Sequence, residues 1–153
     1  MYNMFQVAEY YLIKDSMTPK KLQKIVYYAY AWFITLMNED ACSIDNKLFL
    51  EKPEAWVHGP VFRSLYDKYK NYGFNEIPKA ESKNFNFNKD TLDILEQVWD
   101  VYGKFTANEL ESLTHQESPW ILARNGCSKY EICNSTISDT EIFRCYNNRW
   151  YNG

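Results

Sequence analysis

Apolar residues recur every three to four positions along most of the chain, and short polar stretches with proline or glycine separate these runs. This spacing is typical of helices that pack one face against a core. The longest run, residues 19–38, carries an apolar stripe from Leu22 to Leu36. We predict helices at residues 4–13, 19–38, 60–73, 90–103, 106–115 and 139–146, with a short helical turn at residues 118–124.

Residues that favour helix ends lie at the borders of these runs. Thr18 precedes Pro19, and a capping side chain followed by proline at the first helical position is a typical helix start. Glu109 follows Thr106 by three positions, which indicates a capping box. The other predicted starts are Gly59-Pro60, Asp90, Ser118-Pro119 and a second capping box of Ser138 and Glu141, and the predicted ends are Gly73, Gly103 and Gly126.

One stretch lacks helical spacing. Residues 47–60 alternate apolar and polar positions in two short runs, which predicts a short two-stranded β element around residues 47–58. Residues 74–89 are the most polar part of the chain, so we expect a surface loop there. The predicted fold is mainly α: a compact bundle of about six helices with this small β element, in one domain over residues 1–153.

Composition supports a folded core and narrows the function. Hydrophobic residues make up 46% of the 153 residues and aromatic residues 18%, enough to offset the entropy of ordering the chain. The net charge of −3 argues against nucleic acid as the main partner, because that binding depends on neutralising phosphates. No run reaches the roughly 18 apolar residues of a membrane span, and the first residues do not resemble a signal peptide. We therefore expect a cytoplasmic protein with no membrane partner.

The stretch LTHQESPWILAR, Leu113 to Arg124, is the densest group of chemically active residues. His115 and Glu117 match the His-x-Glu of zinc deaminases, but those sites also need Pro-Cys-x-x-Cys, and here Pro119 is followed by tryptophan. The four cysteines match no common zinc spacing, so we expect free thiols, no metal site and no cofactor. We interpret the motif as a corner in which His115 ends one helix and Ser118 caps the next.

Three stretches together resemble a known family. They are KLQKIVYYAYAW (residues 21–32), PEAWVHGPVFRSLYDKY (residues 53–69) and VYGKFTANELESLTHQESPW (residues 101–120). In this order and spacing they are similar to the Panacea domain, the SocA-like antitoxin family, also known as phage-associated protein. The family's largely helical fold agrees with the pattern of helices predicted above.

The resemblance implies a protein that binds another protein and is not an enzyme. Such domains act as antitoxins that neutralise a cognate toxin by direct contact, and one branch is an adaptor that delivers its toxin to a cytosolic AAA+ protease. The family occurs in prophages and other mobile elements, and many members carry additional N-terminal DNA-binding segments. Because the first predicted helix leads almost directly into the first motif here, we do not expect autoregulation by direct DNA binding.

Some residues in or beside these motifs carry polar groups that packing does not require, and we predict that they form a partner-binding surface or pocket. The three lysines in the first turns of the second predicted helix are also unusual, because the positive end of the helix dipole disfavours cations. A carboxylate opposite them, from this chain or from a partner, would explain them. The predicted partner-binding residues are Lys24, Tyr28, Trp56, His58, Arg63 and His115.

Other functions stay open at this point. An enzyme or small-ligand binder could use a pocket of Trp56, His58, His115 and Glu117, which requires the two histidines to meet in space. A nucleic-acid binder could use Lys20, Lys21, Lys24 and Arg63 with nearby aromatic rings. A phage protein with this fold could also inhibit a host defence system.

Overall fold

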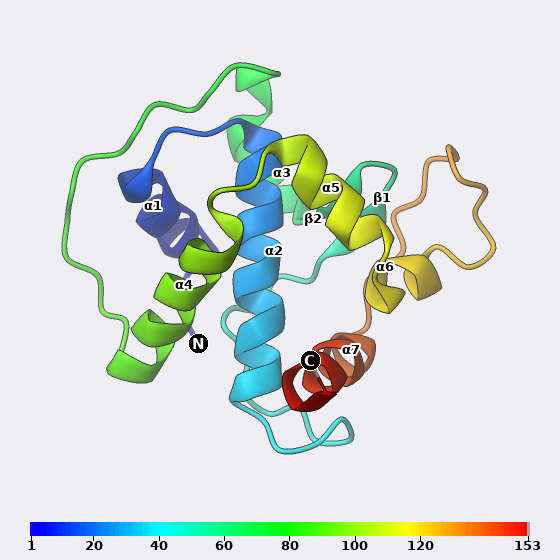
Figure 1. Ribbon diagram of the computed structural model, residues 1–153. Coiled ribbons are helices and arrows are strands. Elements are labelled where there is room, and N and C mark those ends of the chain that lie inside the picture. Colours follow the sequence, from blue (N-terminus) through cyan, green and yellow to red (C-terminus); the bar gives the residue numbers. More distant parts are fainter. Residues whose placement is uncertain (153) are drawn as a thin grey trace.

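The computed structural model describes residues 1–152, which form seven α-helices, one 3-10 turn and a two-stranded antiparallel sheet. Figure 1 shows α2 running through the centre, with the other elements arranged around it. This confirms the predicted mainly helical fold with one small β element. The elements are α1 (Met4–Lys14), α2 (Pro19–Leu36), β1 (Glu54–Trp56), β2 (Gly59–Val61), α3 (Arg63–Tyr69), η1 (Lys70–Tyr72), α4 (Lys89–Tyr102), α5 (Ala107–His115), α6 (Ser118–Ala123) and α7 (Asp139–Asn152).

The core is built around α2. Residues 22–31 of this helix are all buried, so its surface is covered on every side rather than along one stripe. α1 and α4 pack on one side of it, and α7, α5, α3 and β2 cover the rest. The helix begins as predicted, because the Thr18 hydroxyl accepts a hydrogen bond from the backbone N–H of Lys21 and Pro19 takes the first position.

The helix starts differ from the prediction at three places. α3 begins at Arg63 and not at residue 60, because residues 59–61 pair with residues 54–56 as strand β2. Asn88 caps α4 in place of Asp90, since its side chain accepts from the N–H of Thr91. Ser118 is the first residue of α6 and not its cap. The predicted capping box of Thr106 and Glu109 at the start of α5 is confirmed.

The β element is shorter than predicted and lies at the end of the expected stretch. Its strands are residues 54–56 and 59–61, which we call the hairpin, and Val57 and His58 form the turn between them. Gly59 has φ +108°, a conformation that L side chains rarely adopt. The turn therefore depends on this glycine, and the same Gly-Pro pair that resembles a helix start belongs to a strand.

A buried carboxylate connects three elements on the other side of α2. Glu117, just before α6, accepts hydrogen bonds from the hydroxyls of Tyr28 on α2 (3.0 Å) and Tyr146 on α7 (2.7 Å). Arg149 of α7 donates to its second oxygen at 2.9 Å. Burial, and then the charge of Glu117, raise the pKa of Tyr28 well above its ordinary value, so this hydroxyl remains a donor. α7 also extends to residue 152, beyond the predicted end at residue 146.

We predict that Gly59→Ala destabilises the protein strongly. A Cβ there would lie 2.6 Å from Cε of the buried Lys24 and 3.0 Å from Oγ1 of Thr114, in addition to the strain of the positive φ. We expect a loss of about 2–4 kcal/mol in the free energy of unfolding, measured by urea denaturation. Gly126→Ala is the matched control, because Gly126 has φ +96° with no atom near the added Cβ. Equal losses for the two variants would contradict the packing of Lys24 beneath the hairpin.

Candidate functional site

The corner between α5 and α6 holds the first strand of the hairpin through its backbone. Three side chains of this corner each donate a hydrogen bond to one of three successive carbonyls. Isolated two-stranded hairpins are marginal in water, so these bonds fix an element that would otherwise be mobile. The pairs are Arg124 with Ala55 (Nη1–O 2.9 Å), Trp120 with Trp56 (Nε1–O 2.8 Å) and His115 with Val57 (Nε2–O 2.9 Å).

This arrangement gives the Leu113–Arg124 motif a structural role. His115 ends α5, as the sequence predicted, but its imidazole binds the hairpin rather than the carbonyls of its own helix. Its ring stacks on the half-buried Trp120, with 4.1 Å between the centroids. Burial lowers the pKa of His115, against the attraction of Glu111. The imidazole therefore favours the neutral form, with its proton on the nitrogen that donates to Val57.

Helix α2 holds the second strand and Phe62, the residue that follows it. Gln23 pairs with both backbone groups of Phe62: the Phe62 N–H donates to Oε1 at 2.9 Å, and Nε2 donates to the Phe62 carbonyl at 3.1 Å. Lys24, which is 1% exposed, donates to the carbonyl of Pro60 at 3.2 Å. Burial first, and then the charge of Lys20, lower the pKa of Lys24 to about 7. Near neutral pH this amine is thus close to losing its proton.

Carboxylate and carbonyl groups of this chain lie opposite the other lysines of α2. Lys20 forms an ion pair with Glu111 of α5 at 2.5 Å and donates to the side chain of Asn108. Lys21 donates to the carbonyl of Gly103 at the end of α4, where the helix dipole favours a cation. The unusual lysines at the start of α2 are therefore explained within the chain.

The two histidines meet at Glu111. His58 Nδ1 lies 3.2 Å from Glu111 Oε1, and His115 Nε2 lies 4.0 Å from Oε2. Burial alone would raise the pKa of Glu111, but hydrogen bonds from Lys20 and His58 hold it below its ordinary value. Both histidines line an open depression of about 570 Å³. Two members of the predicted pocket lie elsewhere: Trp56 lines other hollows, and Glu117 points into the core toward Tyr28.

The outer surface around the hairpin carries the aromatic and apolar groups that a binding site needs. Trp56 lies between two hollows: a cleft of about 410 Å³ toward α2 and α3, and a hollow of about 370 Å³ toward residues 132–134. Arg63 lies over the Trp56 ring at 5.3 Å, and Tyr66 packs against its edge at 5.0 Å. We define the hairpin face as Trp56, His58, Arg63, Tyr66, Phe74 and Ile132.

Two of these residues are among the most exposed apolar side chains of the protein. Phe74 is 99% exposed and Ile132 is 92% exposed. Apolar side chains rimmed by polar groups in this way mark interaction surfaces. Sequence reasoning missed Tyr66, Phe74 and Ile132. A signal existed for Tyr66, because it falls off the apolar stripe that the spacing of Leu65 and Tyr69 predicts.

The six predicted site residues do not form one surface. Trp56, His58 and Arg63 lie on the hairpin face. Lys24 and His115 lie beneath it and hold hairpin carbonyls. Tyr28 is fully buried, with its hydroxyl on Glu117. The partner-binding role of these residues stays a prediction. Three of them lie where a partner can touch them, two support the hairpin and one is in the core.

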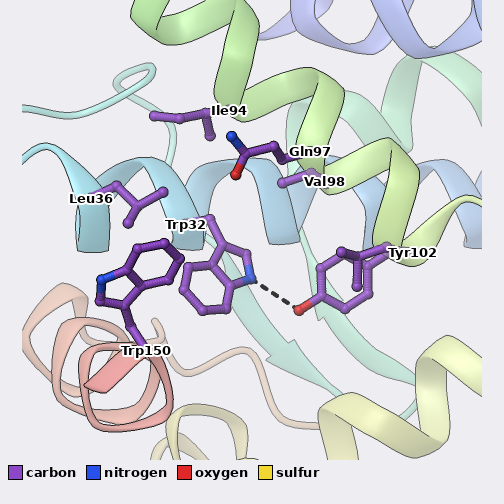
Figure 2. A pocket seen from close by; sticks show the side chains of 8 residues that line it. Trp32, Leu36, Ile94, Gln97, Val98, Tyr102 and Trp150 are labelled. Atoms are coloured by element: carbon purple, nitrogen blue, oxygen red, sulfur yellow. Dashed lines mark hydrogen bonds between the residues drawn. The ribbon is translucent and has the colours of Figure 1, made fainter. Parts of the chain in front are cut away.

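A second, smaller pocket of about 120 Å³ lies toward the other end of α2 (Figure 2). Trp32 and Trp150 face each other across it, and the indole N–H of Trp32 donates to the hydroxyl of Tyr102 at 2.9 Å. Its lining has no charged side chain. The hairpin face is the stronger candidate because it joins exposed aromatic groups with cations and larger hollows.

Two further observations limit the chemistry. Within residues 1–152 no three histidine, cysteine or acidic side chains are grouped closely enough to hold a metal ion. None of the helices over the same residues has both the length and the apolar character needed to cross a bilayer.

The fold and site define a helical scaffold that presents a rigidly held hairpin. The family model of the antitoxin SocA-like Panacea domain matches residues 22–121, more than half of the chain, and the protein belongs to this family. The match begins in α2 and ends in α6, so it includes the hairpin and every side chain that binds its carbonyls except Arg124. Searches of curated proteins and of solved structures found no match. Membership implies an antitoxin with a non-enzymatic role.

We predict that Lys24 makes the stability depend on pH. The folded amine has a pKa of about 7 and an exposed lysine has a pKa of 10.5, so below pH 7 the buried charge costs stability and above pH 10.5 that cost is gone. The free energy of unfolding of the wild type should therefore rise relative to Lys24→Met between these values, by at most about 5 kcal/mol. Urea denaturation at pH 6.5, 8 and 9.5 measures this. Parallel pH profiles of the two proteins would refute the depressed pKa.

Proposed function

We propose that the protein is an antitoxin that neutralises a cognate toxin protein by direct contact through the hairpin face. The observation that carries this proposal is the half-buried Trp56 of the hairpin beside the exposed Arg63 and Tyr66 of α3, on a hairpin that side chains of three helices hold by its carbonyls. Tryptophan, tyrosine and arginine are the residues in which binding energy concentrates at protein interfaces. Family membership supplies the class of partner.

The rigid support of the hairpin favours tight binding. Association costs free energy when loops and side chains must be ordered at the interface. Here the backbone around Trp56 is already fixed by Trp120 and His115, and its ring is held between Arg63 and Tyr66. A partner therefore meets an aromatic anchor that is ordered before it arrives.

We also propose that this protein acts in the cytoplasm as a single domain. Delivery of the bound toxin to a AAA+ protease, which the resemblance implies for one branch of the family, would need a second surface, because the toxin would cover the hairpin face. Such delivery would add degradation of the toxin to its neutralisation by binding.

A small-ligand or catalytic role at the two histidines is the second candidate. It is favoured by their meeting at Glu111 in an open depression. The contacts favour protein binding over catalysis. Glu111 already forms an ion pair with Lys20, and Nε2 of His115 already donates its proton to the carbonyl of Val57. His58 remains the exposed member of the group and belongs to the hairpin face.

We predict that Trp56→Ala weakens toxin binding by about 2 kcal/mol or more, roughly a thirtyfold loss of affinity, and abolishes protection. The test is co-expression with the toxin encoded by the neighbouring gene, scored by growth, followed by titration calorimetry. Tyr66→Ala is a second variant at the same face, with less effect on the hairpin itself. Trp150→Ala is the control, since this tryptophan is 57% exposed and lies in the other pocket.

The proposal fails if the toxin stays neutralised by folded Trp56→Ala and Tyr66→Ala proteins. It also fails if Trp150→Ala is the variant that loses protection, because the contact surface would then lie at the opposite end of α2. Thermal unfolding of each variant distinguishes a lost contact from a lost fold.

A further inference from the structure

The hollows on the two sides of Trp56 have an unusual charge. Their combined lining contains Lys20, Lys24, Lys70 and Arg63, together with His58, and it contains no aspartate or glutamate. The whole chain has a net charge of −3. The carboxylates that pair with Lys20, Arg63 and Lys70 line neither hollow, so the cations are the charged groups that face an arriving partner and favour an anionic one.

Several of these cations have donors that a partner can use. The Nζ of Lys70 is 3.6 Å from Asp67, and about half of each side chain is exposed, so this pair is weak and easily redirected. Nε and Nη2 of Arg63 donate hydrogen bonds to Glu54. Within residues 1–152, Nη1 of Arg63 donates no hydrogen bond. An arriving carboxylate can therefore bind both side chains without breaking the internal pair of Arg63.

Lys24 adds a reason for an anion at this place. Lys24 lines the larger cleft although it is only 1% exposed, and within the described residues its amine has one hydrogen bond, to Pro60. Two groups near this amine are or can become positively charged, Lys20 and His115. The nearby carboxylate of opposite charge is Glu111. A second carboxylate in the cleft would offset the cost of burying this ammonium group.

The aromatic walls of the cleft favour a ligand that has apolar groups as well as carboxylates. Trp56, Tyr66, Tyr69 and Phe74 surround the cations, and the volume of about 410 Å³ is within the range of sites that enclose a bound ligand. Carboxylates alone would leave these rings in water. A group that carries both charge and apolar side chains fits the whole surface.

We propose that the hairpin face binds an acidic segment of the partner protein, in which aspartate or glutamate side chains flank an aromatic or aliphatic anchor. This inference rests on the proposed function, because it names the chemistry of the toxin's docking segment. The carboxylates pair with Lys70 and Arg63 at the rim, and the anchor packs in the cleft against Trp56 and Tyr66. Nucleic acid fits less well, since the cleft is largely apolar.

The test is a selection of random twelve-residue peptides, displayed on phage, against the purified full chain. We expect enriched peptides with acidic residues within three positions of an aromatic or aliphatic residue. The best peptide, synthesised with a fluorescent label, should bind at least tenfold more weakly to the double variant Arg63→Gln/Lys70→Glu, and more weakly at higher salt. Binding is measured by fluorescence anisotropy.

A matched control has the same change of charge elsewhere. Lys89→Glu/Arg144→Gln alters two exposed side chains that line neither hollow, and it should change the affinity by less than twofold. Enrichment of neutral or basic peptides, no enrichment, or equal binding by both double variants would overturn the proposal. So would a labelled single-stranded oligonucleotide that binds in place of the peptide and is lost in the Arg63→Gln/Lys70→Glu protein.

The contact surface and the acidic character of its ligand are tested by different variants. If Trp56→Ala abolishes neutralisation while Arg63→Gln/Lys70→Glu neutralises fully, the toxin binds the hairpin face but its docking segment is not acidic. If neutralisation persists in Trp56→Ala, the proposed contact surface itself is wrong, whatever the peptide selection gives.

Discussion

The structure depends on one constraint: the backbone carbonyls of a hairpin of only two strands must find donors outside the sheet. Buried carbonyls without partners are costly, and two strands cannot supply all the donors. Here side chains of α2, α5 and α6 supply them. Lys24 binds the second strand, Trp120 and Arg124 bind the first, His115 binds the turn between them, and Gln23 binds Phe62 just after the hairpin. These donors come from positions far apart in the chain, so the hairpin forms only when the helices are in place.

This constraint explains why three distant stretches of this chain depend on one another. The Lys-Leu-Gln-Lys stretch of α2 and the Thr-His-x-x-x-Pro-Trp stretch at the α5–α6 corner hold opposite strands of the element that contains Glu-Ala-Trp-x-x-Gly-Pro. Gly59 lets Lys24 approach the hairpin from below, where any Cβ would collide with it. Four side chains of these stretches, Gln23, Lys24, His115 and Trp120, support the hairpin region, while Trp56 and Arg63 lie at the surface.

The sequence predicts the helices well because their ends carry local chemistry. Thr18-Pro19 and the capping box of Thr106 and Glu109 act through neighbouring residues, so their spacing is sufficient. Gly59-Pro60 was interpreted as a helix start for the same reason, and it was wrong because strand pairing with residues 54–56 is not a local interaction. The polar character of Tyr28 and His115 indicated a special role, but only the fold reveals that their partners are Glu117 and Val57.

Amide hydrogen–deuterium exchange of the protein with and without its bound toxin shows whether the partner covers the hairpin face, because exchange reports which backbone groups a partner protects. We expect slower exchange at residues 56–74 and 130–134, with little change in the second half of α4 or at the end of α7. Protection confined to α4 and α7, around Trp32 and Trp150, would contradict it.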